Sequence, residues 1–150
     1  MIIPESGWAK PLPQVDPLTE HYFRAAANGT LLIERCPECK HAQHYPRGVC
    51  TECGAAPQWE AVSGTGTVYT FSIVWQSGAP GFKQEMPYVV ALIDLDEGPR
   101  LMGNITGCPV EDVKIGARAE AYVVRADEEI GIVQWRLTRH RAAAGQEDAR

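Results

Sequence analysis

Apolar residues recur at helical spacing in one segment near the N-terminus. One face of this segment carries three of them, Leu18, Tyr22 and Ala25. Asp16 can cap a helix, and Pro17 suits the first helical position because its missing N–H needs no partner there. Asn28-Gly29 then supplies a left-handed stop. The pattern predicts a short amphipathic helix over residues 17–27, which follows a proline-rich, extended arm over residues 1–15.

The second half of the chain alternates between apolar and polar residues with a period of two. The alternation predicts five strands, at residues 68–75, 88–95, 100–105, 117–124 and 132–138. Gly64 and Gly66 interrupt the start of the first strand, as expected for a bulge or a sharp coil. Five short strands with a strongly bent first one are typical of a Greek-key barrel. We therefore expect a mainly β protein with a C-terminal five-stranded OB-fold barrel.

Four cysteines lie in two tight pairs between the helix and these strands. The pairs are Cys36 with Cys39 and Cys50 with Cys53, and ten residues separate them. A strand at residues 31–35 leads into the first pair. Each pair has the sequence of a metal-binding knuckle, and Gly54 suits the left-handed position after the second pair. The stretch has too little apolar bulk to fold by burial alone, so a metal cross-link is required.

The cysteine set defines the kind of metal site. Four thiolates form a closed tetrahedral shell, as in structural zinc sites, whereas a catalytic zinc keeps one position for water. Zinc is the expected ion, although the same ligands also build iron centres of the rubredoxin type. His41 and His44 lie between the pairs. We expect both to be loop histidines, since four cysteines already complete the shell.

Composition narrows the class of protein. The chain has 150 residues and a formal net charge of −5, which disfavours a protein that grips a polyanion. No apolar run reaches the length of a membrane span, and the N-terminal residues lack the pattern of a signal peptide. Five cysteines, four of them closely paired, fit metal binding in a reducing compartment better than a disulfide framework. We therefore expect a cytoplasmic protein.

The patterns divide the chain into four regions. They are an arm and helix at 1–30, a rubredoxin-like zinc ribbon at 31–58, an OB-fold domain at 59–140 and a disordered tail at 141–150. None of them carries a recognisable catalytic constellation such as a nucleophile elbow, a phosphate-binding glycine loop or a zinc-protease motif. The sequence thus favours a protein that is not catalytic by itself.

Aromatic residues of the first barrel strand leave an alternative function open. Tyr69, Phe71 and Trp75 can stack nucleic-acid bases, as in OB folds that bind single strands. The alternative is therefore a single-stranded nucleic-acid-binding OB-fold protein with a structural zinc ribbon. The acidic net charge disfavours it. The alternation of these aromatics favours core packing for most of them.

The order of segments along the chain resembles a known family. The helix, the strand Leu31-Leu32-Ile33-Glu34-Arg35 and the two knuckles are followed by Trp59 and Val62-Ser63-Gly64-Thr65-Gly66-Thr67-Val68-Tyr69-Thr70-Phe71. Pro87 to Met102 and Val113-Lys114-Ile115-Gly116 come later. This order resembles the acyl-CoA-associated family that joins an N-terminal helix, a rubredoxin-like zinc ribbon and a C-terminal OB fold. The resemblance covers about residues 16–138.

The resemblance implies a function. Members are accessory subunits, or fused domains, of thiolase-fold enzymes: thiolases, lipid-transfer-protein-type retro-aldolases and acyltransferases. The partner supplies the catalytic residues, and the accessory subunit helps to bind acyl-CoA, for example in steroid or fatty-acid side-chain degradation. The resemblance thus implies a heterotetramer or larger assembly with a thiolase-like subunit. It leaves open which kind of partner this chain has, and which acyl group.

Two sets of candidate residues follow. Trp8 in the arm and Leu18, Tyr22 and Phe23 on the helix are candidates for the partner interface; alternatively, the helix packs only on the rest of the chain. Lys83, in the glycine-containing loop 77–86, and Arg100 are candidates for acyl-CoA binding because cations pair with phosphates. The alternative for these two is an ordinary surface charge.

Overall fold

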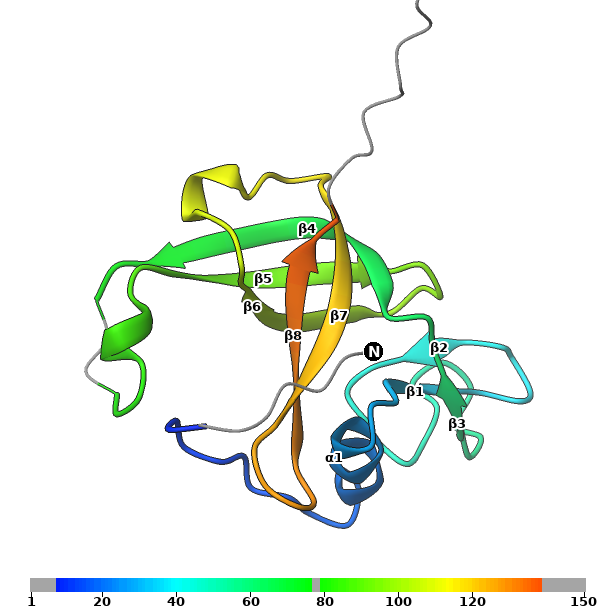
Figure 1. The fold of residues 1–150 in the computed structure, drawn as a ribbon. Coiled ribbons are helices and arrows are strands. Elements are labelled where there is room, and N and C mark those ends of the chain that lie inside the picture. The colour runs from blue at the N-terminus through cyan, green and yellow to red at the C-terminus, as the bar shows by residue number, and fades with distance from the viewer. Residues whose placement is uncertain (1–7, 77–78, 139–150) are drawn as a thin grey trace, which may run out of the picture.

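The chain forms a helix, a small ribbon and a barrel in the predicted order (Figure 1). The computed structural model describes residues 8–76 and 79–138. The predicted fold class, mainly β with an N-terminal helix, a zinc ribbon and a five-stranded OB-type barrel, is confirmed. The predicted disorder of residues 141–150 lies outside the described residues. Within the described ranges, no helix has the length and apolarity needed to cross a membrane.

Helix α1 spans Glu20–Ala27 and begins three residues later than expected. Asp16 starts the preceding turn: its Oδ1 accepts N–H bonds from Leu18 (2.9 Å) and Thr19 (2.8 Å). Its backbone oxygen then accepts the N–H of Glu20 at 2.8 Å. The predicted cap therefore exists, and the turn that it begins leads into the helix at Glu20. The left-handed stop is confirmed, since Gly29 has φ +84°.

The buried face of α1 packs on the barrel. A Cβ on Gly131 would lie 2.3 Å from the backbone carbon of Ala26, so only glycine allows this approach. The Arg125 guanidinium donates to the carbonyl oxygen of Ala27 at 2.8 Å. These contacts fix the helix against the hairpin formed by the last two strands.

The ribbon is a three-stranded antiparallel sheet. Its strands are β1 (Leu32–Arg35), β2 (Ala42–Gln43) and β3 (Gln58–Ala61), in the order β2-β1-β3. Strand β3 pairs with β1 along its whole length. Residues 59–61, at the start of the region expected to form the OB-fold domain, thus hydrogen-bond within the ribbon sheet. Period-two alternation alone does not say which sheet a strand joins.

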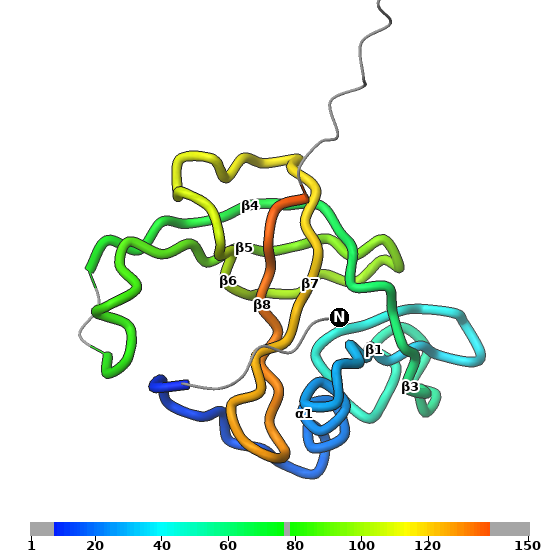
Figure 2. The backbone as a smooth tube through the Cα atoms, viewed as in Figure 1, coloured from blue at the N-terminus to red at the C-terminus, as the bar shows by residue number. Residues whose placement is uncertain are grey.

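The barrel closes from five strands (Figures 1 and 2). They are β4 (Thr65–Val74), β5 (Tyr88–Leu95), β6 (Arg100–Ile105), β7 (Arg118–Arg125) and β8 (Gly131–Leu137). Their order is β4-β5-β6-β8-β7, and β4 pairs with β7 to complete the closure. Strands β6 and β8 run parallel, and the other neighbours run antiparallel.

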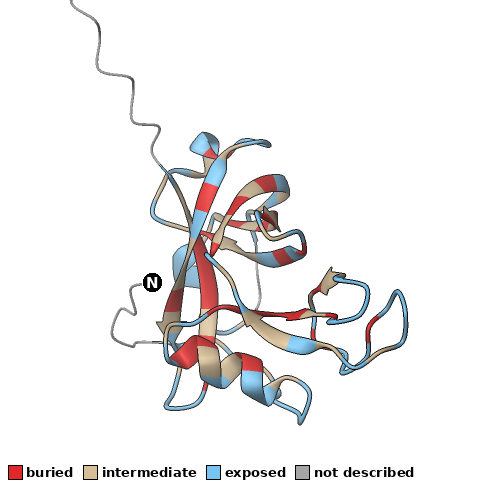
Figure 3. Cartoon of the chain, turned by 90° about the vertical axis from the view of Figure 1, so that its right-hand side faces the viewer, coloured by how far each residue is buried: buried red, intermediate tan, exposed pale blue. Residues whose placement is uncertain are grey.

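The barrel core centres on Trp135, which is fully buried. Gly103 lies against its ring, where a Cβ would come within 2.8 Å of the indole. Residues of β5 alternate strictly between buried and partly buried. Figure 3 colours the buried residues of the chain red. The core is therefore apolar side-chain packing that is built around one large ring.

The expected single inward face of β4 is wrong. The register shifts between Val68 and Thr70, which marks a β-bulge. Before the bulge Val68 faces the core, and after it Phe71 and Ile73 are partly buried against the core. Tyr69, at the bulge, is 49% exposed, and Trp75, which follows the end of β4, is 63% exposed, so neither packs inside.

Candidate functional site

The four ribbon cysteines converge on one point. Their sulfur atoms all lie within 4.8 Å of one another. The Sγ atoms of Cys36 and Cys53 are 3.4 Å apart, and those of Cys39 and Cys50 are 3.6 Å apart. Among the described residues, this is the one group of cysteine, histidine and acidic side chains arranged to hold a metal.

Each knuckle turns in the same way. In the first, the N–H of Lys40 donates to the carbonyl oxygen of Cys36 at 3.0 Å, and in the second Gly54 donates to Cys50 at 3.0 Å. Both donors are left-handed, with φ +65° at Lys40 and φ +79° at Gly54. The left-handed position of Gly54 was predicted. Lys40 was missed, although its place one residue after a Cys-x-x-Cys pair is the same signal.

The residues fit a structural zinc ion. Four sulfur ligands and a closed tetrahedral arrangement are what zinc takes in ribbons. The backbone N–H of Cys39 points at the sulfur of Cys36 (3.5 Å) and lowers the pKa of that thiol to about 7. The N–H of Cys53 likewise lowers the pKa of Cys50. These backbone bonds favour the thiolate form of Cys36 and Cys50, which is the form that binds metal, whereas the pKa values of Cys39 and Cys53 are raised.

The two ribbon histidines have other roles. His41 Nε2 lies 3.2 Å from the hydroxyl of Thr51. The ring of His44 packs between Tyr22 (5.1 Å) and Tyr45 (4.3 Å), and burial lowers its pKa to about 4. His44 is therefore neutral at pH 7 and belongs to the contact between helix and ribbon, as expected for a loop histidine.

A buried carboxylate supports the second knuckle. Glu34 is 5% exposed and accepts hydrogen bonds from Gln43 (2.7 Å) and from the backbone N–H groups of Arg47 (2.9 Å) and Gly48 (3.1 Å). Gln43 in turn accepts the N–H of Thr51 at 3.0 Å. The network therefore ties β1 and β2 to the loop that carries Cys50. Sequence reasoning missed it, although a glutamate inside an apolar strand was a signal.

The structure separates the four interface candidates. Tyr22 is 7% exposed and lies in the core, so its side chain does not reach the surface of the described structure. Phe23 is partly buried against the same core. Trp8 lies in the wall of a cavity beside the barrel. Leu18 is 49% exposed. Of these candidates, the structure leaves only Leu18 fully available.

Leu18 lies at a junction between helix and ribbon. Its Cδ2 would be 3.1 Å from a Cβ on Gly48, which places it over the ribbon loop. Tyr45 and Val49 in that loop are 51% and 47% exposed. We call Leu18, Tyr45 and Val49 the junction surface. Sequence reasoning missed the two loop residues because no periodic pattern marks them.

The two acyl-CoA candidates lie at opposite ends of strand β5. Lys83 is exposed and precedes Tyr88, in the short 3₁₀ helix Lys83–Glu85. Arg100 pairs with Asp94 at 2.6 Å and stacks on the ring of Tyr69, with 3.3 Å from Cζ to the ring centroid. Six residues of strand separate the two ends, about 20 Å. The structure therefore does not bring Lys83 and Arg100 to one phosphate.

A cavity of about 580 Å³ opens on the Lys83 side. The arm, the β4–β5 loop and the outer faces of β7 and β8 line it. Cys108 also lines it, and burial raises the pKa of its thiol. The Cys108 thiol is therefore protonated at pH 7 and acts as a wall residue of the cavity.

The geometry defines a class of protein: a zinc ribbon and an OB barrel, joined through one helix. Comparison with known proteins gives the family. Residues 23–60 match the description "ChsH2, rubredoxin-like zinc ribbon domain", and residues 59–124 match "ChsH2, C-terminal OB-fold domain". The chain belongs to the DUF35 family, since a relative of that family is 38% identical and is covered over 71% of its length.

Three relatives illustrate the similarity. A "DUF35 domain-containing scaffold protein" of Methanocaldococcus jannaschii is 38% identical over 101 residues, which are 66% of this chain and 71% of that protein. A "Probable enoyl-CoA hydratase alpha subunit" of Thermomonospora curvata is 36% identical over 129 residues, 85% of this chain. This chain spans only 40% of that relative's length. The "3-oxo-4,17-pregnadiene-20-carboxyl-CoA hydratase alpha subunit" of Mycobacterium tuberculosis is 37% identical over 59 residues, 39% of this chain and 18% of that protein.

A solved structure shares the whole architecture. A chain of the "Ltp2-ChsH2(DUF35) aldolase" superposes with a TM-score of 0.76 at 33% identity, over 84% of this chain and 98% of that one. A DUF35 protein of Sulfolobus solfataricus superposes with a TM-score of 0.57 at 16% identity, which shows the fold alone.

Proposed function

We propose that this chain is a non-catalytic accessory subunit that binds a thiolase-fold partner, either a thiolase or a lipid-transfer-protein-type retro-aldolase, and helps to bind its acyl-CoA substrate. The observation that carries the proposal is the likeness to the DUF35 chain of the aldolase structure, which extends over nearly all of that chain. The closed thiolate shell supports it, because such an ion holds a fold and leaves no position for substrate.

The assembly has a proposed composition and place. We expect a heterotetramer or larger complex in the cytoplasm, with catalytic residues on the thiolase-like subunit. Steroid or fatty-acid side chains are the proposed substrates, since two relatives carry the names of CoA-ester hydratase subunits.

The junction surface is the proposed docking site for the partner. It is apolar and exposed, and it combines the turn before α1 with the loop between the two cysteine pairs. Co-expression with thiolase-like proteins from the same genome, followed by affinity capture of this chain, tests the proposal. Leu18→Asp together with Val49→Asp should reduce capture at least about tenfold, because both introduce a charge into a desolvated contact.

Ile115→Asp is the matched control, since Ile115 is 69% exposed and lies in the loop before β7, in a part of the chain that is neither arm, helix nor ribbon. If Ile115→Asp reduces capture as strongly as the junction variant does, the proposed docking site is wrong. Failure of every thiolase-like protein to bind the unaltered chain would contradict the proposed function itself.

Lys83 is the proposed phosphate contact. It is exposed beside the cavity, whereas Arg100 already pairs with Asp94. Lys83→Ala should weaken binding of acyl-CoA to the complex several-fold, and Lys114→Ala, an exposed lysine before β7, should not. Equal affinity for both variants and the unaltered complex would remove Lys83 from the proposal, and Arg100→Ala would then be tested in the same way.

A further inference from the structure

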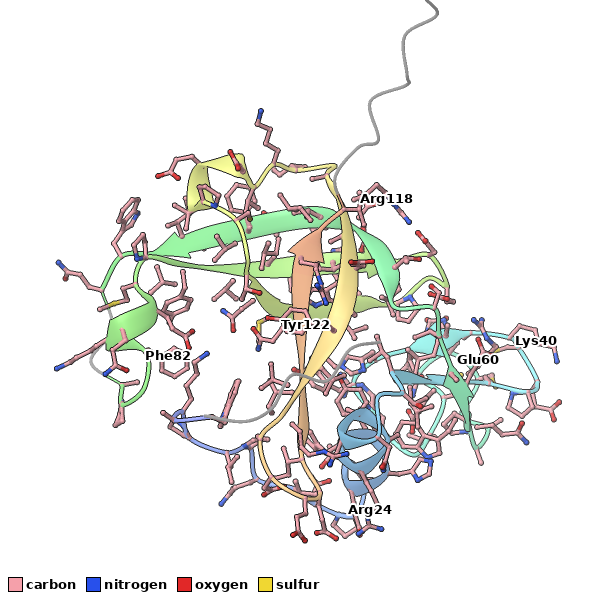
Figure 4. The ribbon with its side chains drawn as sticks, viewed as in Figure 1. Arg24, Lys40, Glu60, Phe82, Arg118 and Tyr122 are labelled. Atoms are coloured by element: carbon pink, nitrogen blue, oxygen red, sulfur yellow. The ribbon has the colours of Figure 1, made fainter. Side chains whose placement is uncertain are left out.

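The cavity beside the barrel has two walls from parts of the chain that are distant in sequence. One wall is the barrel surface, where Tyr122 on β7 and Gln134 on β8 are paired across the strands. The other consists of the arm at residues 8–10 and the β4–β5 loop at residues 81–87. Figure 4 shows Phe82 on the loop side of this region and Tyr122 on the barrel side.

The arm is fastened to the loop. Lys10 Nζ pairs with Glu85 at 2.6 Å, and it lies over the rings of Trp8 (4.6 Å) and Phe82 (5.3 Å). Gly81 has φ +80°, and a Cβ there would come within 2.5 Å of the carbonyl oxygen of Ala9. The outer wall of the cavity is therefore a specific structure that an alanine at one position would disturb.

One polar group in the cavity wall is buried without a partner. Trp8 Nε1 has no hydrogen bond among the described residues. An unpaired buried donor is costly, and native proteins usually satisfy it. Gln134, which is 4% exposed, adds an amide to the same lining. A molecule inside the cavity can therefore accept from the indole N–H and pair with the Gln134 amide.

The lining selects a neutral ligand. Lys10 and Glu85 are its charged residues, and they neutralise each other. The hydroxyl groups of Tyr122 and Thr106, 2.6 Å apart, add further polar contacts on the barrel side. Among the residues that line the cavity, a phosphate would meet no free cation, and a plain hydrocarbon would leave the Trp8 indole N–H unpaired. The fitting chemistry is an aliphatic chain with amide groups.

We propose that this cavity binds the pantetheine arm of coenzyme A. That arm is neutral and carries two amides between methylene groups, so its carbonyls can accept from Trp8 and its amides can pair with Gln134. The volume lies within the range of about 300–1,000 Å³ that small-molecule sites occupy. The choice of coenzyme A as the source of the chain rests on the proposed function. Lys83 lies beside the cavity, where the phosphates of the same molecule would emerge.

The test titrates the full, zinc-loaded chain with pantetheine and follows its ¹H–¹⁵N spectrum. The indole N–H signal of Trp8, assigned by its loss in Trp8→Phe, should shift on titration, and that of the exposed Trp75 should not. Trp8→Phe and Gln134→Met keep ring and length but remove the polar groups. Each should raise the Kd for pantetheine roughly 3- to 10-fold.

Trp75→Phe and Gln58→Met are the matched controls, since both residues are exposed and outside the cavity, and their affinity should stay unchanged. The nucleotide part alone, as 3′,5′-ADP, should leave the Trp8 signal in place. An unmoved Trp8 signal at saturating millimolar pantetheine would overturn the proposal. A shift of equal size with decanoate would also overturn it, because the cavity would then be an apolar site only.

This outcome is separable from that of the proposed function. Pantetheine binding that depends on Trp8 and Gln134 in a chain that captures no thiolase-like partner would support the cavity assignment and contradict the proposed function. If the chain captures a partner but its Trp8 signal does not shift with pantetheine, the proposed function is supported and the cavity assignment is wrong.

Discussion

The ribbon and the barrel of this chain are stable for different reasons. The barrel surrounds Trp135 with apolar side chains, and its closure depends on burial. The ribbon adds Leu32 and Ile33 of β1 to the same core, but its cysteine knuckles and the loop between them are held by metal ligands and a buried glutamate. The difference teaches that two regions that share one core can still depend on different interactions, which selective changes can expose.

Removal of the metal should give the largest effect. Structural zinc contributes on the order of 10 kcal/mol in small zinc domains. Cys36→Ser, or a strong chelator, should therefore unfold residues 36–53 and abolish capture by the partner, while the barrel keeps its structure. Amide hydrogen exchange read by segment measures this. A ribbon that stays protected after complete loss of zinc would contradict the structural role of the ion.

Truncation of Trp135 should instead destabilise the barrel and leave the zinc site intact. Trp135→Ala leaves a cavity in the barrel and should lower the free energy of unfolding by about 3–5 kcal/mol. Chemical denaturation followed by far-UV circular dichroism measures it, and zinc content under native conditions should stay at one per chain. Trp75→Ala, at an exposed position, should change stability by less than about 0.5 kcal/mol. Equal losses in both variants would argue against a core centred on Trp135.

The buried glutamate should give a smaller effect that is confined to the ribbon. Glu34→Ala leaves Gln43 and the N–H groups of Arg47 and Gly48 without their acceptor, which should cost about 1–3 kcal/mol. Because that loop carries Cys50, zinc affinity should fall by roughly 10- to 100-fold, as measured by competition with a chelator. Glu38→Ala, in the exposed part of the first knuckle, is the control. Unchanged zinc affinity in Glu34→Ala would remove the network from the metal site.

An exposed ion pair on the barrel should give the smallest effect, and only within a pH window. Arg118 holds Asp96 at 2.6 Å, and this bond, with one from Thr65, lowers the pKa of that carboxyl below its usual value. A lowered pKa in the folded state adds stability above the unfolded value, near 3.9, and this stability is lost as the pH falls below it.

Thermal unfolding at a series of pH values checks this prediction. Asp96→Asn should melt slightly below the unaltered chain at pH 7, and the gap should narrow as the pH falls below about 4. Asp112→Asn should show no such pH dependence, since Asp112 has no ion pair within the described part of the chain. A gap that is constant with pH would contradict the role of the Asp96 charge.

The sequence predicted the features that depend on local spacing. The cysteine knuckles, the glycine after the second pair and the helix stop each depend on a few neighbouring residues, and all three are present. Strands β5 and β6 lie at the predicted residues because turns bound them on both sides.

Features that depend on distant contacts could not be predicted. Tyr22 and Leu18 share one predicted helical face, but tertiary packing, including that of His44 from the ribbon, buries Tyr22 in the core. The bulge at Val68 reverses which residues of β4 face inward. The cavity was invisible because Lys10 and Glu85 are far apart in the sequence and meet only in the fold.

Strand β8 connects the helix contact at Gly131 directly to the wall of the cavity. The bare backbone of Gly131 seats the helix beside the junction surface, and three residues further along the same strand Gln134 faces the cavity. About 10 Å of continuous strand thus separates the helix seat from the cavity wall. A partner that binds at the helix would also fix the orientation of β8. Docking would thereby set the position of the cavity relative to the partner's active centre.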